Sequence, residues 1–160
     1  MIEIINGDLL SANAQYIAHA CNCVTRTSAF FAKDLFNKYP YADIYSGRFS
    51  ADKPGNIIIK GNGEDERFII GLLSQFYPGK PNFPDSTLDG IRIREKYFYH
   101  CLLRIAKIEN LNSIAFNWRI GCGAAGGNWE HYLGMLTNFA QYVKSTQNTK
   151  VFIYKREFDE

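Results

Sequence analysis

Residues 120–129 read Ile120-Gly121-Cys122-Gly123-Ala124-Ala125-Gly126-Gly127-Asn128-Trp129. A β-rich run, residues 113–117, precedes this stretch, and a helical pattern that Asn128 can cap follows it. Glycines at this density permit positive φ angles and the close approach of another molecule. Successive backbone N–H groups in such a loop, beside the positive end of a helix dipole, suit an anion, most often a phosphate. The stretch therefore predicts a strand, an anion-binding loop and a helix.

The glycine loop (residues 121–127) also satisfies the pattern G-x-G-x-x-G. A dinucleotide-binding unit needs an acidic residue about 20 positions later, at the end of a second strand. Here that distance falls at residues 141–146, inside the last predicted helix, and no acid stands there. No Gly-Lys-Ser/Thr occurs, which excludes a P-loop. Two interpretations remain: a phosphate-binding loop of another kind, or a tight turn that needs glycine only for its geometry.

The rest of the chain alternates strand-like and helix-like segments. Strands are predicted over 2–6, 16–21, 56–60, 67–73, 113–117 and 150–155. Helices are predicted over 28–38, in the long segment that starts at 86–89, and from 128 onward. Gly61-Asn62-Gly63 indicates a hairpin between two of the strands. This alternation predicts an α/β fold, with a central sheet covered by helices on both faces, and residues 1–160 as one domain.

Composition sets the broad class. The chain is 46% apolar and 21% charged, which is ordinary for a globular protein, and its net charge of +2 is too small to predict nucleic-acid or membrane binding. No apolar run approaches the roughly 20 residues that span a bilayer. The amino terminus is typical of a first strand rather than a signal peptide. We expect a cytoplasmic protein, with a nuclear setting as the alternative, and no membrane partner.

Four cysteines, at 21, 23, 101 and 122, are expected to be free thiols in a reducing compartment. His19, Cys21 and Cys23 alternate, so a strand places them on one face, as a metal site requires. Zinc usually takes four ligands from paired clusters, and no second cluster is present. We therefore expect buried thiols, no metal and no cofactor.

Two further groups follow the first two predicted strands. Gly7-Asp8-Leu9 follows the first, and the second ends in His19-Ala20-Cys21-Asn22. Asp8 and Asn22 are individually explained as turn residues, and His19 as a hydrogen-bonded core histidine. Ligands in α/β sheets bind at strand ends, however. The joint order of these groups, with the glycine loop before another helix, favours a site.

These stretches together resemble the macrodomains, the ADP-ribose-binding family with a three-layer α/β/α fold and a central mixed sheet. The resemblance covers nearly the whole chain and includes Val151-Phe152-Ile153-Tyr154 as the last strand. It is nearest to the branch that holds ADP-ribose-1″-phosphate phosphatases, terminal ADP-ribose hydrolases and antitoxins that remove ADP-ribose from DNA.

The resemblance implies a role for each group. Asp8, between Gly7 and Leu9, would bind the adenine amine, with Leu9 beside the ring and Tyr154 on the adenine face. Asn22 would orient the distal ribose, and His19 would act as general acid or base. The ligand-binding backbone would come from Ser28, Ala29 and Phe30 in one loop and from Gly121, Cys122, Gly123, Ala124, Ala125 and Gly126 in the other.

The chain also departs from the family. Residues 24–31 lack the glycines of the usual first phosphate loop, and Ala29 and Phe30 stand in their place. Arg26 either pairs with phosphate or is a solvated surface charge. The catalytic lysine of the hydrolase branch would fall near Gln75, which cannot form a Schiff base, and its acidic partner near Ala125. Lys80 follows Pro78-Gly79 and is interpreted as a surface lysine.

Three hypotheses follow. The first is an enzyme that hydrolyses an ADP-ribose derivative, by a phosphatase-like or de-ADP-ribosylating route. The second is a non-catalytic reader or sequestering module for ADP-ribose or a related nucleotide. The third is a degenerate domain, with Phe30 and Phe31 filling the former pocket and a protein as its partner. The ligand is expected to be ADP-ribose or a relative, free or attached to protein or nucleic acid.

Overall fold

The fold is described from a computed structural model, over residues 1–159. Within these residues the strands are β1 (Ile2–Asn6), β2 (Tyr16–Cys21), β3 (Ile57–Lys60), β4 (Phe68–Leu73), β5 (Ser113–Asn117) and β6 (Lys150–Lys155). The helices are α1 (Phe30–Lys38), α2 (Ile91–Ala106) and α3 (Trp129–Gln147). Short 3₁₀ turns lie at Leu9–Ser11 and Pro40–Ala42. None of the helices in this range is long and apolar enough to cross a membrane.

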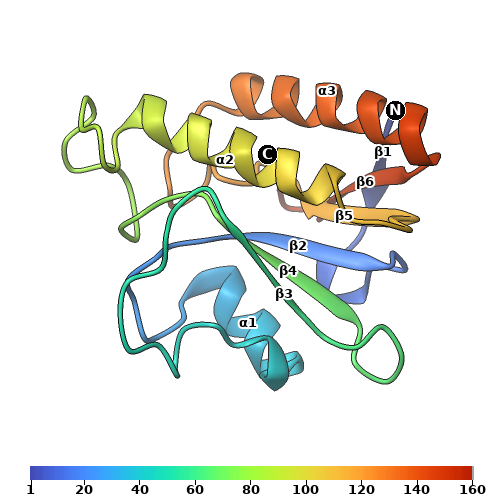
Figure 1. Cartoon of the computed structure of the whole chain (residues 1–160), viewed down its shortest axis with the longest axis horizontal. Coiled ribbons are helices and arrows are strands. Elements are labelled where there is room, and N and C mark those ends of the chain that lie inside the picture. The colour runs from blue at the N-terminus through green and yellow to red at the C-terminus, as the bar shows by residue number, and fades with distance from the viewer. Residues whose placement is uncertain (160) are drawn as a thin grey trace.

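The strands form one sheet in the order β1-β6-β5-β2-β4-β3. Strand β3 pairs with β4 in the antiparallel sense, as the glycine-containing hairpin predicted, and the other neighbouring pairs are parallel. Helices α2 and α3 lie together on one side of the sheet and α1 lies on the other (Figure 1). The predicted three-layer α/β/α arrangement with a central mixed sheet is therefore confirmed.

Two apolar clusters hold the layers together, one on each face of the sheet. On β2, Ala18 faces the cluster beneath α2 and α3, whereas Ile17 and Cys21 face the cluster beneath α1. The central strands are buried on both faces, which explains why β2 and β4 are almost continuously apolar. Burial of this apolar surface is the main force that fixes the sheet between its helices.

Two helix starts differ from the sequence prediction. The helix expected from residue 28 begins at Phe30, and the one expected near 86–89 begins at Ile91. At the second site the Ser86 hydroxyl accepts hydrogen bonds from the backbone N–H groups of Leu88 and Asp89. Serine often satisfies the backbone of a turn in this way. The pattern at 86–89 that predicts a helix start therefore forms a turn, and the helix begins after it.

The parallel strands end at a common edge, called here the carboxyl edge. After β5 the chain continues to α3 on one face of the sheet, and after β2 it continues to α1 on the other. Strands β5 and β2 are neighbours, so the loops that leave them diverge from a topological switch point. Ligands of open α/β sheets bind at such points.

Candidate ligand-binding site

The glycine loop leaves β5 through two tight turns. Gly121 and Gly126 have φ angles of 76° and 77°, in the left-handed region that favours glycine. The N–H of Gly127 donates to the carbonyl of Gly121 across 3.0 Å, which closes the loop on itself. A Cβ on Gly121 would lie 2.6 Å from the Tyr132 ring, so glycine is needed there for packing as well. The turn geometry foreseen in the sequence is present.

The same loop presents unused donors. Within residues 1–159, the backbone N–H groups of Gly121, Gly123, Ala124 and Ala125 donate to no acceptor. Gly123 and Ala124 are exposed, and a Cβ added to Gly123 would meet nothing within 4 Å. Asn128 caps α3 by accepting the N–H of His131, so the loop stands at a helix N-terminus. Free amides beside a helix dipole form a site for an anion.

The loop after β2, residues 22–29, is shaped by its own side chains. The side-chain Oδ1 of Asn22 accepts from the N–H groups of Val24 and Thr25 at 3.0 and 2.9 Å and from the Thr25 hydroxyl at 3.1 Å. Asn22 is only 8% exposed, and its amide nitrogen lies 3.4 Å from the hydroxyl of Tyr45. The side chain expected to orient a distal ribose therefore serves the turn, which was the alternative interpretation of this residue.

A buried arginine, Arg48, which no sequence pattern indicates, binds the backbone of this loop. The Arg48 guanidinium donates to the backbone carbonyls of Thr25 and Asn22 at 2.9 and 3.0 Å, and it pairs with Asp52 at 2.9 Å. The residues on either side of it in the sequence, 46–47 and 49–50, are exposed, so no pattern in the chain marks its burial. The Arg48 guanidinium thus holds the 22–29 loop in place through the backbone carbonyls of that loop.

Helix α1 begins beside that loop without a side-chain cap, because Ala29 occupies the N-cap position. Phe30 has a φ of 53°, a left-handed conformation that bulky residues rarely adopt. Its side chain is 79% exposed and so does not fill a pocket. The backbone at Phe30 therefore has a conformation that glycine adopts without strain.

His19 lies in the core beneath α1. It is 3% exposed, its ring nitrogens lie 3.5 Å from the Cys21 sulfur, and its ring packs edge-on against Phe36 at 5.6 Å. Burial lowers the pKa of His19 to about 4, so the ring is neutral near pH 7. The predicted sharing of one face with Cys21 is present, but the ring is packed inside the protein and does not line the carboxyl edge.

The groups expected around adenine are divided between surface and core. Asp8 is exposed and accepts the N–H of Leu10 at 3.0 Å, which caps a 3₁₀ turn and leaves one carboxylate oxygen for other donors. Leu9 is 1% exposed, so its side chain belongs to the core rather than to a ligand surface. Tyr154 is half-buried next to Gly7, and its hydroxyl accepts the N–H of Asn13 at 3.4 Å.

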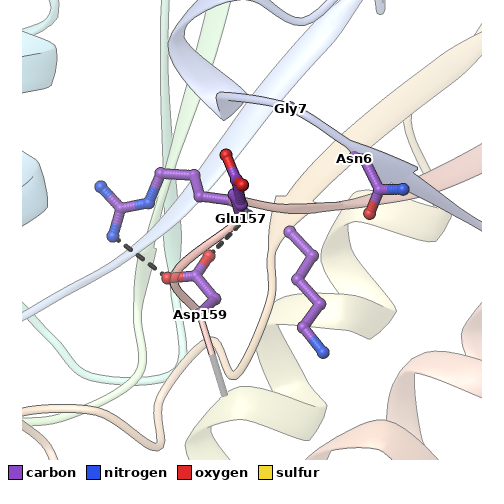
Figure 2. Close-up of a pocket in the computed structure, with 6 residues that line it drawn as sticks. Asn6, Gly7, Glu157 and Asp159 are labelled. Carbon is purple, nitrogen blue, oxygen red and sulfur yellow. Dashed lines mark hydrogen bonds and ion pairs between the residues drawn. The ribbon is translucent and has the colours of Figure 1, made fainter.

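A cavity of about 650 Å³ opens at the ends of β1 and β6. Its lining residues are Asn6, Gly7, Lys155, Arg156, Glu157 and Asp159 (Figure 2). The segment after β6 closes back on itself, because Asp159 accepts the N–H of Arg156 at 2.7 Å and pairs with its guanidinium at 3.3 Å. No pattern in the sequence marks this segment after Tyr154, because its charged composition is that of an ordinary solvated tail.

The loop after β4, residues 75–80, also reaches the carboxyl edge. Gln75 is 8% exposed, and its amide donates to the carbonyl of Tyr77 at 2.8 Å. Lys80 is exposed, as the sequence predicts for a surface lysine, but its aliphatic stem lies against the glycine loop. A Cβ on Gly126 would stand 2.9 Å from the Lys80 Cγ. The amine nearest the glycine loop along this segment is thus Lys80, five residues after Gln75.

The four cysteines are free and buried, as expected. Among residues 1–159, no cluster of three or more histidine, cysteine, aspartate or glutamate side chains is placed to hold a metal ion.

Comparison with known proteins gives matches along nearly the full length. No family model matches the chain. An uncharacterized 17.5 kDa protein from the tk-vs intergenic region of Enterobacteria phage T4 is 26% identical over 155 residues, which cover 90% of this chain and 93% of that protein.

Solved macrodomain structures superpose well. The macrodomain of Mycobacterium tuberculosis DarG has a TM-score of 0.75 at 20% identity, covering 96% of this chain and 97% of its own. The macrodomain of Thermus aquaticus DarG has a TM-score of 0.69 at 18% identity, with 97% and 98% covered. A Trypanosoma brucei macrodomain in complex with ADP-ribose has a TM-score of 0.68 at 12% identity, with 96% and 63% covered. The strand order, the helices on both faces and these superpositions agree, and the chain has the macrodomain fold.

Proposed function

We propose that this protein binds ADP-ribose, or a close derivative, across the carboxyl edge of its sheet. The observation that carries the proposal is the set of free backbone N–H groups at Gly121, Gly123, Ala124 and Ala125, at a helix N-terminus and beside the switch point. A diphosphate is the anion whose several oxygens can accept from several free donors on one loop. The T. brucei macrodomain that shares this fold is solved in complex with ADP-ribose, which supports the choice of nucleotide.

The proposed ligand extends along the strand ends. Asp8 after β1 accepts the adenine amine, the glycine loop after β5 binds the diphosphate, and residues 22–30 after β2 contact the distal ribose. Strands β1, β6, β5 and β2 are consecutive neighbours, and neighbouring strands lie about 4.8 Å apart, so the three intervals span about 14 Å. This separation suits an elongated ligand with recognised groups at both ends.

Calorimetry with ADP-ribose, ADP and AMP tests the binding proposal. ADP-ribose is expected to bind most tightly, ADP more weakly because it lacks the distal ribose, and AMP weakest because it lacks the diphosphate. If none of the three binds, the proposal is wrong and the interaction module of the third hypothesis is favoured.

We further propose that the protein hydrolyses an ADP-ribose derivative, on ADP-ribosylated protein, ADP-ribosylated nucleic acid or ADP-ribose-1″-phosphate. Support comes from the position of Lys80 against Gly126, because an amine there is next to the proposed diphosphate. Lys80→Ala is expected to reduce turnover of the preferred substrate much more than it reduces ADP-ribose affinity. Lys60→Ala, which removes an exposed lysine of β3, is the matched control.

A non-catalytic reader is the alternative that specific observations favour. His19 is buried and neutral, and the Asn22 amide is used within its own loop. Neither side chain is then available for proton transfer or ribose orientation. Tight ADP-ribose binding by the parent protein, without product from any of the three substrates, supports the reader and contradicts hydrolysis.

A further inference from the structure

A buried ion pair at the start of α2, between Asp89 before the helix and Arg94 in its first turn, connects two loops of the carboxyl edge. Asp89 and Arg94 meet through two contacts, 2.6 Å between Oδ2 and Nη2 and 3.0 Å between Oδ1 and Nε. Their side chains are 7% and 4% exposed, so the pair is almost free of solvent. A bidentate guanidinium–carboxylate pair has a fixed geometry as well as a fixed charge balance.

The carboxylate of this pair holds the loop that follows β4. Asp89 accepts the backbone N–H of Phe76 at 2.6 Å through one oxygen and that of Tyr77 at 3.1 Å through the other. With Arg94 included, each carboxylate oxygen therefore accepts two hydrogen bonds, and the start of the 75–80 loop is fixed in position.

The guanidinium holds the same loop and the glycine loop together. Arg94 donates to the carbonyl of Tyr77 at 3.2 Å and to that of Gly79 at 2.7 Å, both in the 75–80 loop. The Nη1 atom of Arg94, which donates to Gly79, also donates to the carbonyl of Ala125, in the glycine loop, at 3.2 Å. A single side chain thus spans two loops that leave different strands, and lysine has too few directed donors to replace it.

Lys80 is the next residue after the segment so held. Its stem is packed against Gly126, which is the neighbour of Ala125. The contact of the Lys80 stem with the glycine loop therefore depends on both loops keeping one relative placement. The mutual attraction of a buried ion pair is often matched by well-packed apolar residues. What apolar residues could not replace here are the hydrogen bonds from the pair to the backbone of both loops.

We infer that Asp89 and Arg94 are the positioning pair of the ligand site, which couple the glycine loop to the 75–80 loop so that a diphosphate bound on the first sets the place of Lys80. This inference rests on the proposed function for the identity of the ligand. The coupling of the two loops is a property of the free protein and is tested separately.

Hydrogen exchange of the free protein tests the coupling. The reporting amides are the hydrogen-bonded ones, Phe76 and Tyr77 in one loop and Gly126 and Gly127 in the other. Arg94→Lys keeps the charge opposite Asp89 but cannot reach all the carbonyls. The variant is expected to speed exchange in both loops together, by about tenfold or more. Local opening costs less free energy once the hydrogen bonds from Arg94 to the loop carbonyls are gone.

Arg67→Lys is the matched control, because Arg67 also donates to two carbonyls, those of Ala12 and Ala14. It precedes β4, at the opposite edge of the sheet, and its replacement is expected to leave exchange in the two loops unchanged. Faster exchange in one loop only, or in neither, overturns the inference. If Arg94→Lys does not fold, the double variant Asp89→Leu/Arg94→Met is read at Gly126 and Gly127 alone, because Phe76 and Tyr77 lose their acceptor in it. Unchanged exchange at those two glycines overturns the inference.

A ligand-bound experiment compares the parent protein with Arg94→Lys and gives a second test. Saturating ADP is expected to slow exchange at Phe76 and Tyr77 as well as at Gly126 and Gly127, and in Arg94→Lys only at the glycine loop. Slowing confined to the glycine loop of the parent overturns the inference. If ADP and ADP-ribose do not bind the parent, the proposed function fails, and the exchange rates of the free variants still decide whether the pair couples the loops.

Discussion

Phe30 illustrates how a side chain can change while its backbone stays. The resemblance placed a glycine at this position, and the phenylalanine retains a φ of 53°. A left-handed conformation costs a residue with a Cβ about 1–2 kcal/mol, and such strain is concentrated at functional sites. The replaced glycine was visible in the sequence, but the retained conformation was not, because it is imposed by the loop on one side and α1 on the other.

Phe30→Gly is expected to raise the free energy of unfolding by up to about 1 kcal/mol, because glycine adopts this φ without strain and the lost ring is mostly exposed. Phe30→Ala keeps the Cβ and its strain, so it is expected to change stability little. Urea unfolding of both variants measures the difference. If Gly and Ala are equally stable relative to the parent, the strain at this position is absent.

Asp8 has two roles that substitution can separate. Asp8→Ala is expected to weaken ADP-ribose binding by about 1–3 kcal/mol, because a desolvated adenine amine loses its acceptor. Asp8→Asn still accepts the N–H of Leu10 and so preserves the 3₁₀ turn that this residue caps. Calorimetry together with thermal unfolding distinguishes the roles. Unchanged affinity in Asp8→Ala removes the residue from the site.

At the scale of the element, the glycine loop offers two glycines with different surroundings. A Cβ on Gly126 would stand 2.9 Å from Lys80 at a φ of 77°, whereas a Cβ on Gly123 would meet nothing within 4 Å. Gly126 is therefore required by the backbone conformation and packing of the loop, whether or not a ligand is bound. Gly123 is exposed and next to unused amides, so the space beside it is available to a ligand.

Gly126→Ala is expected to lower the free energy of unfolding by about 1 kcal/mol or more, because it adds both strain and a clash. Gly123→Ala is expected to leave stability nearly unchanged and to weaken ADP-ribose binding, because its methyl group takes the space of the diphosphate. Unfolding and calorimetry on both variants check this. Gly123→Ala with full affinity contradicts the placement of the diphosphate on this loop.

The elements themselves were largely predictable. Four strands, β1, β2, β5 and β6, have the predicted limits, because their apolar runs end at polar or glycine residues. Helix starts were less predictable, since Ser86 and Asp89 carry helix-start chemistry but bind loop backbone instead. Sequence propensity describes local preference, and here tertiary hydrogen bonds used the same groups for another purpose.

At the scale of the whole molecule, the chain places five strand ends side by side at the carboxyl edge. The turn of the glycine loop and the place of Asp8 after β1 could be predicted, because the first follows from glycine backbone geometry and the second from the end of an apolar run; their roles in binding stay predictions. The places of Arg48, Arg94 and Lys80 could not, because each depends on segments that are distant in sequence and meet only in the fold. Periodicity does not indicate which loop a long basic side chain will reach.

His19 gives the molecule a predictable sensitivity to acid, because it lies in the cluster that joins α1 to the sheet. Its folded pKa is about 4, below the value of about 6.5 expected in the unfolded chain, so the unfolded chain binds a proton first as the pH falls. The stability that neutral His19 supplies is complete above about pH 6.5 and is lost as the pH falls from there toward 4. Between pH 7.5 and 4.5 the loss amounts to about 2–3 kcal/mol.

His19→Leu removes this titration and fills the site with an apolar side chain. The variant is expected to lose about 2–3 kcal/mol less than the parent between pH 7.5 and 4.5, whatever its stability at neutral pH, when urea unfolding is measured at both values. His131→Gln, at an exposed histidine of α3, controls for histidine replacement in general. A parent and a His19→Leu variant with parallel pH dependence would mean that solvent reaches the ring and that it titrates as in the unfolded chain. His19 would then again be available for the acid–base role that its burial now argues against.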